Sequence, residues 1–296
     1  MSPEVLISAF ITGIILGGLY MVVAVGYSLI FGVIRVINLA HGSLLMLFMY
    51  AGFWLWHFFG IDPYVSILLV APLAFACGYL LQDTLVRPMY EHEKSAVSGP
   101  LGVLLMTAGL GIVLQNVAML VFKSDTRGVI VPYAQRVIRL GFLSLTITRL
   151  AMIGIALAMV AALHWLLTRT ELGTAIRAVG QNREAAAMCG VNIRRIYAIT
   201  FGIGTAMLGI GGCAMLPFYL VQPWIGVPLG SKSSMIVVLG GLGSIPGAML
   251  GAMIIGVVEA VGAQFVPATA ASIFSLLLFL AVLFVRPKGL MGVVEA

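Results

Sequence analysis

The sequence predicts an all-α fold, a polytopic bundle of membrane helices with about eight or nine passes, some of them broken or re-entrant. Of the 296 residues, 61% are hydrophobic and 9% are charged, and the mean hydropathy is +1.14. Soluble globular domains carry about 25% charged residues. Uncharged apolar runs of about 18 residues or more recur along the chain, each long enough to cross the hydrocarbon as a helix. A transmembrane β-barrel would alternate polar and apolar residues, and this chain does not. Residues 1–296 are therefore expected to form a single transmembrane domain.

Six spans are expected in the first three quarters of the chain. The first covers residues 5–34, carries no charge and is longer than one straight pass. Its glycines predict close helix packing and an irregularity near its end. Because it has no basic leader and exceeds a signal peptide in length, we expect it to stay as a membrane segment. The other five spans are expected at residues 44–59, 64–81, 101–122, 150–167 and 196–216, with a solvated loop at 87–94.

The placement of Lys and Arg predicts the orientation. The loop at residues 168–195 carries five arginines and is the best cytoplasmic candidate. Arg35, Arg87 and Lys94 fall on the same side when the spans are counted, which puts the N-terminus outside. The loop at residues 123–149 must then be external, although it also carries five basic residues. This second basic loop conflicts with the charge rule.

A glycine- and proline-rich break, GGLGSIPGA, interrupts the uncharged run between Lys232 and Glu259. Glycine costs about 1 kcal/mol and proline about 3 kcal/mol in a helix interior, so we expect the chain to reverse at residues 240–247. The reversal would bring Lys232 and Glu259 to the same level, within about 15 Å, where an ion pair or shared polar neighbours would offset their cost. One continuous helix would hold them roughly 40 Å apart.

The arms of this hairpin are short, so both a re-entrant pair and two full passes remain open. Two passes would let the last span, residues 271–285, carry Arg286 and Lys288 to the cytoplasm. The residues that mark the break are Gly240, Gly241, Gly243 and Pro246.

A second helix signal lies in the polar segment at residues 182–190. Asn182 is a typical N-cap, Glu184 occupies the first turn where the helix dipole favours a negative charge, and Gly190 supplies a C-terminal stop. A helix is therefore expected over residues 183–189. Its faces carry small residues, so it buries little core of its own but suits a groove on a partner protein. From the local pattern alone, an ordinary interhelical loop that contains a capped helix is the favoured interpretation.

Polar residues within or beside the spans are candidates for a transport pathway. Asn38 and His41, next to Gly42, lie at the mouth of a span, where polar side chains are costly enough to suggest function. The favoured interpretation, however, is a hydrogen-bonding brace that satisfies backbone groups freed at a helix break. Gln115 and Asn116 would face a pathway or hold helices together.

The sequence contains no motif typical of a catalytic, nucleotide-binding, metal-binding or nucleic-acid-binding site. The chain has no paired carboxylates, no HExxH helix and no Gly-x-Ser-x-Gly elbow, so no catalytic residue is assigned. The stretch GVPLGSKSS resembles a P-loop but lacks the glycine before its lysine. The three cysteines share no metal-like spacing, and basic patches interleaved with aromatic residues are absent, so neither a metal site nor a nucleic-acid partner is expected.

Four stretches carry a family resemblance: GLYMVVAVGYSLIFGVIRVINLAHGSLLML, RAVGQNREAAAMCGVN, SKSSMIVVLGGLGSIPGAMLGAMIIGVVEA and RPKGLMG. The chain closely resembles the permease family of branched-chain amino acid ABC transporters, specifically the shorter permease subunit, over nearly its whole length. The resemblance implies a permease subunit of an ATP-driven importer in the bacterial inner (plasma) membrane. The implied substrate is a branched-chain or related amino acid. The resemblance does not specify the substrate more closely, because similar members carry amides, urea or other amino acids.

The resemblance also implies the roles of segments and partners. The loop at 168–195 would be the cytoplasmic coupling loop, and the segment matching Arg177 to Asn192 would be the coupling helix that docks on an ATPase subunit. The residues expected to serve coupling are Arg177, Gly180, Asn182, Arg183, Glu184, Ala185, Ala186 and Gly190. The expected partners are two ATPase subunits, a second permease subunit, a periplasmic substrate-binding protein at the 123–149 loop, and the lipid bilayer.

ATP and Mg²⁺ would bind the ATPase, so this chain would need no cofactor and hydrolyse nothing. The alternative function is a stand-alone secondary transporter or channel for small polar solutes. Such a protein usually carries charged residues inside its spans, and only Glu259 clearly qualifies here.

Overall fold

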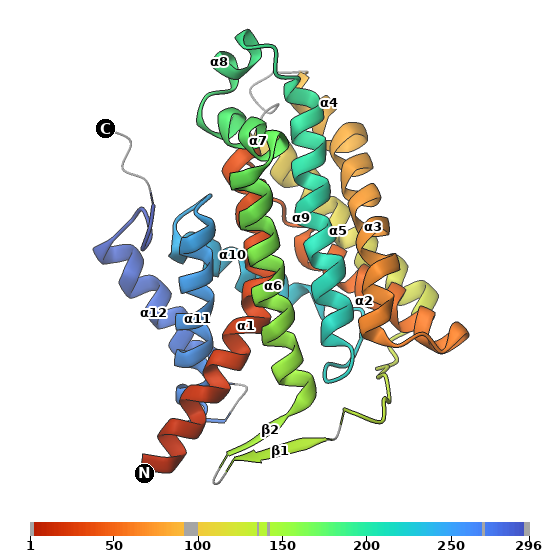
Figure 1. The fold of residues 1–296 in the computed structure, drawn as a ribbon, viewed down its shortest axis with the longest axis vertical. Helices are drawn as coiled ribbons and strands as arrows, with labels where there is room; N and C mark the ends of the chain where they lie inside the picture. The colour runs from red at the N-terminus through yellow and green to blue at the C-terminus, as the bar shows by residue number, and fades with distance from the viewer. Residues whose placement is uncertain (1–2, 92–99, 135, 141–142, 268–269, 293–296) are drawn as a thin grey trace.

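The computed structural model describes residues 3–91, 100–134, 136–140, 143–267 and 270–292, most of them in helices (Figure 1). Within this part of the chain, seven helices are long and apolar enough to cross a membrane. They are α1 (Pro3–Ile34), α2 (His41–Phe59), α3 (Pro63–Leu81), α5 (Pro100–Phe122), α6 (Ile147–Arg169), α9 (Ile193–Met215) and α11 (Ile245–Gly262). Two shorter helices, α10 (Gly226–Gly240) and the apolar α12 (Ser272–Val285), also belong to the bundle. The predicted polytopic helical bundle is confirmed.

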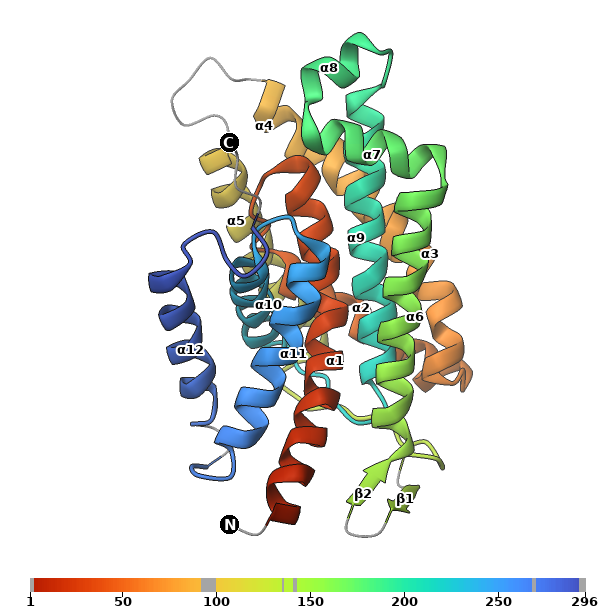
Figure 2. The ribbon, with the colours of Figure 1, turned by 60° about the vertical axis from the view of Figure 1, so that its left-hand side comes forward.

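The two ends of the bundle carry different elements (Figures 1 and 2). The N-terminus lies at the same end as a small β-hairpin, and helices α7 (Glu171–Gln181) and α8 (Arg183–Met188) lie at the opposite end. We call these the hairpin end and the α8 end. Arg35 donates a hydrogen bond to the Gly180 carbonyl, 3.5 Å away, and Arg194 binds both oxygens of Asp83 at 2.8 Å. The end of α1 and the residues that follow α3 therefore gather beside the 168–195 loop, as the spans predicted. Lys94 lies outside the described residues.

Three expectations about local structure were wrong. Helix α1 runs unbroken to Ile34, because its glycines pack against other helices without interrupting its own hydrogen bonds. Residues 87–91 are helical where a loop was expected: a π-helical turn, Gln82–Val86, extends α3 into α4 (Arg87–Glu91). The third departure is the β-hairpin, in which β1 (Val137–Leu140) pairs antiparallel with β2 (Leu143–Thr146). This short hairpin lies beyond the helices, where strand pairing satisfies the backbone.

Close helix packing, predicted from the glycines of the first span, is confirmed between α1 and α11. A Cβ added at Gly256 would lie 2.3 Å from the backbone nitrogen of Gly17, and one at Gly13 would lie 2.5 Å from the Cα of Val257. Only residues without a side chain permit two helix backbones to approach this closely. Helix α11 is therefore held along the N-terminal half of α1.

The predicted reversal at residues 240–247 is also confirmed. Helix α10 ends at Gly240, and the chain turns through Gly241 and Gly243, whose φ angles are +106° and +82°. The Ser244 hydroxyl then caps α11 by accepting a hydrogen bond from the Gly247 amide at 3.1 Å, with Pro246 in the first turn. Positive φ angles favour glycine, and proline is tolerated at a helix start. The local sequence thus accounts for the helical hairpin that α10 and α11 form.

Candidate functional site

Helix α8 has both of the caps that its sequence predicted. The Asn182 side-chain oxygen accepts hydrogen bonds from the amides of Glu184 and Ala185, each at 3.0 Å. Gly190 has a φ of +85°, and its amide and that of Val191 donate to the carbonyls of the last turn at 2.9 and 3.1 Å. This is the Schellman arrangement of a glycine stop. The helix ends at Met188, one residue earlier than expected.

The coupling candidates divide between a docked helix and an exposed one. Helix α7 is capped by the Thr170 hydroxyl and buries Ile176 and Val179 against the bundle. Helix α8 lies at the tip of the molecule (Figure 2). Within Arg183–Met188, all of which the structure describes, Ala186 alone is buried, and Met188 is 84% exposed. Among the other candidates, Arg183, Glu184 and Ala185 are exposed on α8 and Arg177 is exposed on α7.

Gly180 links α7 to the rest of the bundle. A Cβ at Gly180 would lie 3.1 Å from the Gly32 carbonyl oxygen, and a Cβ at Gly32 would lie 2.9 Å from the Gly243 carbonyl oxygen. The backbones of α7, α1 and the α10–α11 turn therefore meet at one place. A cavity of 660 Å³ lies beside this contact and is lined by all three segments.

The predicted pairing of Lys232 with Glu259 is confirmed. The Lys232 ammonium lies 2.5 Å from Glu259 Oε1 and donates to the Tyr20 hydroxyl at 2.8 Å. Tyr20 donates to Glu259 Oε2, and Ser272 donates to Oε1, each at 2.5 Å. We call these four residues the Glu259 cluster. It joins α1, α10, α11 and α12, and sequence reasoning missed Tyr20 and Ser272 because nothing local distinguishes them.

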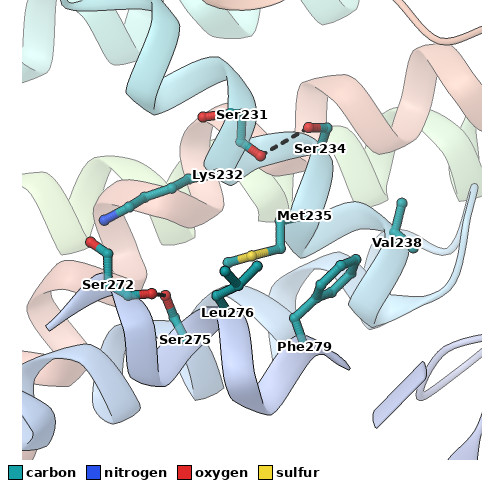
Figure 3. A pocket seen from close by; sticks show the side chains of 9 residues that line it. All are labelled: Ser231, Lys232, Ser234, Met235, Val238, Ser272, Ser275, Leu276 and Phe279. Atoms are coloured by element: carbon teal, nitrogen blue, oxygen red, sulfur yellow. Dashed lines mark hydrogen bonds between the residues drawn. The ribbon is translucent and has the colours of Figure 1, made fainter. Parts of the chain in front are cut away.

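Two cavities adjoin the Glu259 cluster. Cavity A, of 480 Å³, is lined by residues of α1, α6, α10, α11 and α12 and by the segment before α10. Cavity B, of 450 Å³, lies between α10 and α12 and carries four serines, Ser231, Ser234, Ser272 and Ser275, beside Met235, Leu276 and Phe279 (Figure 3). Lys232 and Ser272 line both cavities. The cluster therefore stands between them.

Asn38, His41 and Gly42 lie where α2 begins, deep in the bundle. His41 Nε2 is 3.0 Å from the Val23 carbonyl oxygen, eleven residues before the end of α1 (34 − 23), or about 16 Å along the helix. The Asn38 side-chain oxygen accepts from the Ala40 amide at 3.0 Å. Both side chains thus contact backbone at a helix break, which is what the brace alternative requires. Asn38 Nδ2 and His41 Nδ1 have no hydrogen-bond partner among the described residues, and a pathway role stays a prediction.

Gln115 and Asn116 lie on α5, which packs on α2. Asn116 is exposed and donates to its own helix, at the Ile112 carbonyl, over 2.8 Å, while Gln115 is half-buried. The hydrogen bonds among the described residues connect neither side chain to the Glu259 cluster. The structure therefore does not join these two candidates to Lys232 and Glu259, and their role stays a prediction.

The described part of the 123–149 loop is ordered by its own charged and aromatic residues. Arg127 exchanges two backbone hydrogen bonds with Val221, at 2.9 and 2.7 Å, and its guanidinium lies 5.1 Å from the centre of the Trp54 ring. The Tyr133 hydroxyl donates to Asp62 at 2.6 Å. Burial, together with this hydrogen bond and the charge of Asp62, raises the pKa of Tyr133. Arg127 is therefore part of the loop's structure, and its charge is used within the chain.

Comparison with known proteins gives a consistent result. Residues 9–283 match the family model described as "Branched-chain amino acid transport system / permease component". The chain is 34% identical to the high-affinity branched-chain amino acid transport system permease protein LivH of Salmonella typhimurium, over 95% of this chain and 93% of that protein. It is 33% identical to LivH of Escherichia coli over the same shares. It is 30% identical to the permease protein BraD of Pseudomonas aeruginosa, over 98% of this chain and 97% of that protein.

Proposed function

Because the chain belongs to the family of branched-chain amino acid transport permease components, we propose that it is the permease subunit of an ATP-driven importer for branched-chain or related amino acids. Its relatives are named as permease proteins of high-affinity branched-chain amino acid transport systems. The seven membrane-spanning helix candidates among its described residues suit a multi-pass membrane protein. The chain itself carries out transport, and ATP with Mg²⁺ is bound and hydrolysed by separate ATPase subunits.

The exposure of α8 is the observation that carries the ATPase partnership. A helix of six residues is marginal in isolation, yet this one is capped at both ends and presents Met188 outward with 84% of its surface exposed. An apolar side chain on a preformed helix suits a hydrophobic groove on a partner. We therefore assign α8 as the helix that docks on the ATPase subunit.

The contact of Gly180, Gly32 and Gly243 supplies a route from α8 into the bundle. Helix α7 is anchored by its buried face and touches α1, which in turn touches the α10–α11 turn. A displacement of α8 by the ATPase would move α7 against these two backbones, because close-packed contacts transmit movement. Closure of the ATPases is thereby coupled to alternating access of a pathway through the bundle.

The charge distribution supports the orientation of the importer. Arg35, Arg87 and Arg194 gather at the α8 end, which the charge rule places in the cytoplasm of a bacterial inner membrane. At the opposite end Arg127 is used in internal contacts, which weakens the conflicting signal from that loop. The hairpin end then faces the periplasm and a substrate-binding protein, and a second permease subunit completes the assembly.

The experiment compares two exposed apolar residues at opposite ends. Met188→Glu should abolish co-purification with the ATPase subunit and ATP-dependent leucine uptake in proteoliposomes, while Met188→Leu retains both. Ile130→Glu is the matched control, because Ile130 is 83% exposed in the loop after α5 and should leave ATPase binding intact. Wild-type binding and uptake by Met188→Glu would refute the coupling role. Uptake by the chain without any ATPase would favour the stand-alone transporter.

A further inference from the structure

We propose that cavity A is a binding site for the zwitterionic amino acid on its way through the permease, held at its charged ends by the groups of the Glu259 cluster. This inference rests on the proposed function. It adds a location for the substrate and the residues that contact it.

The walls of cavity A carry the charges that an amino acid requires. Lys232 and Arg149 are cationic and suit the α-carboxylate, and Glu259 suits the α-ammonium. Tyr20 and Tyr219, which carry neutral hydroxyls, also line this cavity. Burial and the charge of Glu259 raise the pKa of Tyr219, so its hydroxyl keeps its proton and remains a hydrogen-bond donor. Hydrogen bonds to charged groups are the stronger class.

The rest of the wall is apolar apart from Thr12, Gln264 and Ser272. Ile15, Leu19 and Met152 line the cavity from α1 and α6. Ala260 lines it from α11, and Ala263 lines it directly after the end of that helix. Small-molecule sites combine such an apolar lining with a few placed polar groups. An aliphatic side chain fits this surface, whereas a basic side chain would find no second carboxylate among the described residues of the wall. The chemistry therefore favours a zwitterion with an aliphatic side chain over one with a basic side chain.

The energetic cost of the Lys232–Glu259 ion pair suggests a role for it other than holding helices together. Removing two charges from water is expensive, and packed apolar residues often hold helices equally well or better. The Lys232 side chain is 21% exposed and that of Glu259 is 8% exposed, so both are largely shielded. A zwitterion offers each residue an opposite charge in place of the other. Both charges then stay compensated when the pair separates around the ligand.

The Lys232–Glu259 pair lies where it could control movement of the amino acid from one cavity to the next. Lys232 reaches from α10 toward Ser272 on α12 at the boundary of cavity B (Figure 3). Cavity B continues along α10 and α12 to Val238 and Phe279, which lie toward the α10–α11 turn. A lysine ammonium is carried by a flexible side chain and can therefore move away from Glu259. Since Lys232 lines both cavities, this movement would open a connection between them. The turn at the far side is the one that touches Gly32, the contact proposed to respond to α8.

The first test removes both charges together. In Lys232→Met/Glu259→Leu no buried charge is left unpaired, so a pair that only holds helices together predicts normal transport. We expect this variant to co-purify with the ATPase subunit and to lose leucine uptake by roughly tenfold or more, as expected for lost hydrogen bonds to charged groups. Wild-type uptake by the double variant would overturn the proposal. Absence of ATP-dependent uptake by the wild-type protein would instead overturn the proposed function.

The second test narrows the apolar wall and does not depend on the double variant folding. Ala263→Phe should raise the KM for leucine several-fold more than the KM for alanine, with kcat for alanine retained, because the larger side chain is excluded first. Ala158→Phe, on an exposed position of α6, is the matched control and should change neither KM. Equal effects on the two substrates, or no effect, would contradict a binding site in cavity A.

Discussion

Helix α8 and the Glu259 cluster are held together in opposite ways. Every capping hydrogen bond of α8 joins residues no more than five positions apart, from Asn182 to Val191. In the Glu259 cluster, Tyr20 and Glu259 are 239 positions apart, and four helices contribute. The comparison teaches that hydrogen bonds between residues close together in the sequence shape the surface proposed to bind a partner. Long-range contacts fix the charged centre of the bundle.

The two regions should also differ in how much stability they contribute. Helix α8 is almost wholly exposed, so its loss would unfold little else, which is typical of elements that move or bind. The Glu259 cluster ties α1, α10, α11 and α12 together around largely buried charges. Removal of one charge from the cluster should therefore destabilise the whole protein, whereas substitutions in α8 should weaken its coupling to the ATPase and leave the bundle folded.

The largest effect is expected from removing one charge of the cluster. Glu259→Leu leaves the Lys232 ammonium without its counter-ion, and breaking one side of a buried pair costs about 3–5 kcal/mol. The thermal unfolding midpoint of the purified protein should fall sharply. Lys232→Met/Glu259→Leu should recover most of that loss. A single variant as stable as the wild type would show that the cluster does not anchor the bundle.

A smaller but still global effect is expected at the contact between the starts of α2 and α10. In Gly42→Ala, the new Cβ would lie 2.0 Å from the Gly226 carbonyl oxygen and 2.8 Å from the Gly230 Cα. Overpacking of this kind costs about 1–3 kcal/mol, here against backbone that cannot rotate away. Gly109→Ala is the control, since outside its own stretch of helix no described atom would lie within 4 Å of the new Cβ. Unfolding midpoints should fall for Gly42→Ala and hold or rise for Gly109→Ala.

At α8, the stop glycine should matter for coupling while the bundle stays folded. Gly190→Val places a β-branched residue at a φ of +85°, which costs about 1–2 kcal/mol in the left-handed region. We expect faster proteolysis within residues 182–192 and weaker ATPase binding at an unchanged unfolding midpoint. Gly190→Asn should be milder, because asparagine tolerates this conformation. Equal behaviour of the two variants would argue against the backbone as the cause.

The smallest effect is expected from the N-cap. Asn182→Ala removes the acceptor for the amides of Glu184 and Ala185, at a cost of about 1 kcal/mol. Hydrogen exchange at those two amides should accelerate severalfold, while amides of α7 keep their protection. Asn182→Asp preserves the acceptor and should exchange like the wild type. Unchanged exchange in Asn182→Ala would mean that contacts other than the cap hold α8.

Sequence reasoning was strongest where short-range chemistry decides the structure. The spans were found within a few residues, because a helix must be apolar over the thickness of the hydrocarbon. The stop at Gly190 and the reversal at residues 240–247 were found because glycine and proline restrict the backbone directly. The pairing of β1 with β2 was missed, since short strands beyond the bundle leave little pattern in so apolar a chain.

The sequence by itself determined that this is a many-pass helical membrane protein, that α8 is capped, and that Lys232 and Glu259 meet across a helical hairpin. Only the tertiary structure decided that Tyr20 and Ser272 complete the charged cluster, that α2 begins deep beside Val23, and that two cavities flank Lys232. Local preferences act through backbone geometry over a few residues and can be read from neighbours in the chain. Which distant side chain compensates a buried charge depends on how helices pack, and packing is set by many weak contacts that no short stretch contains.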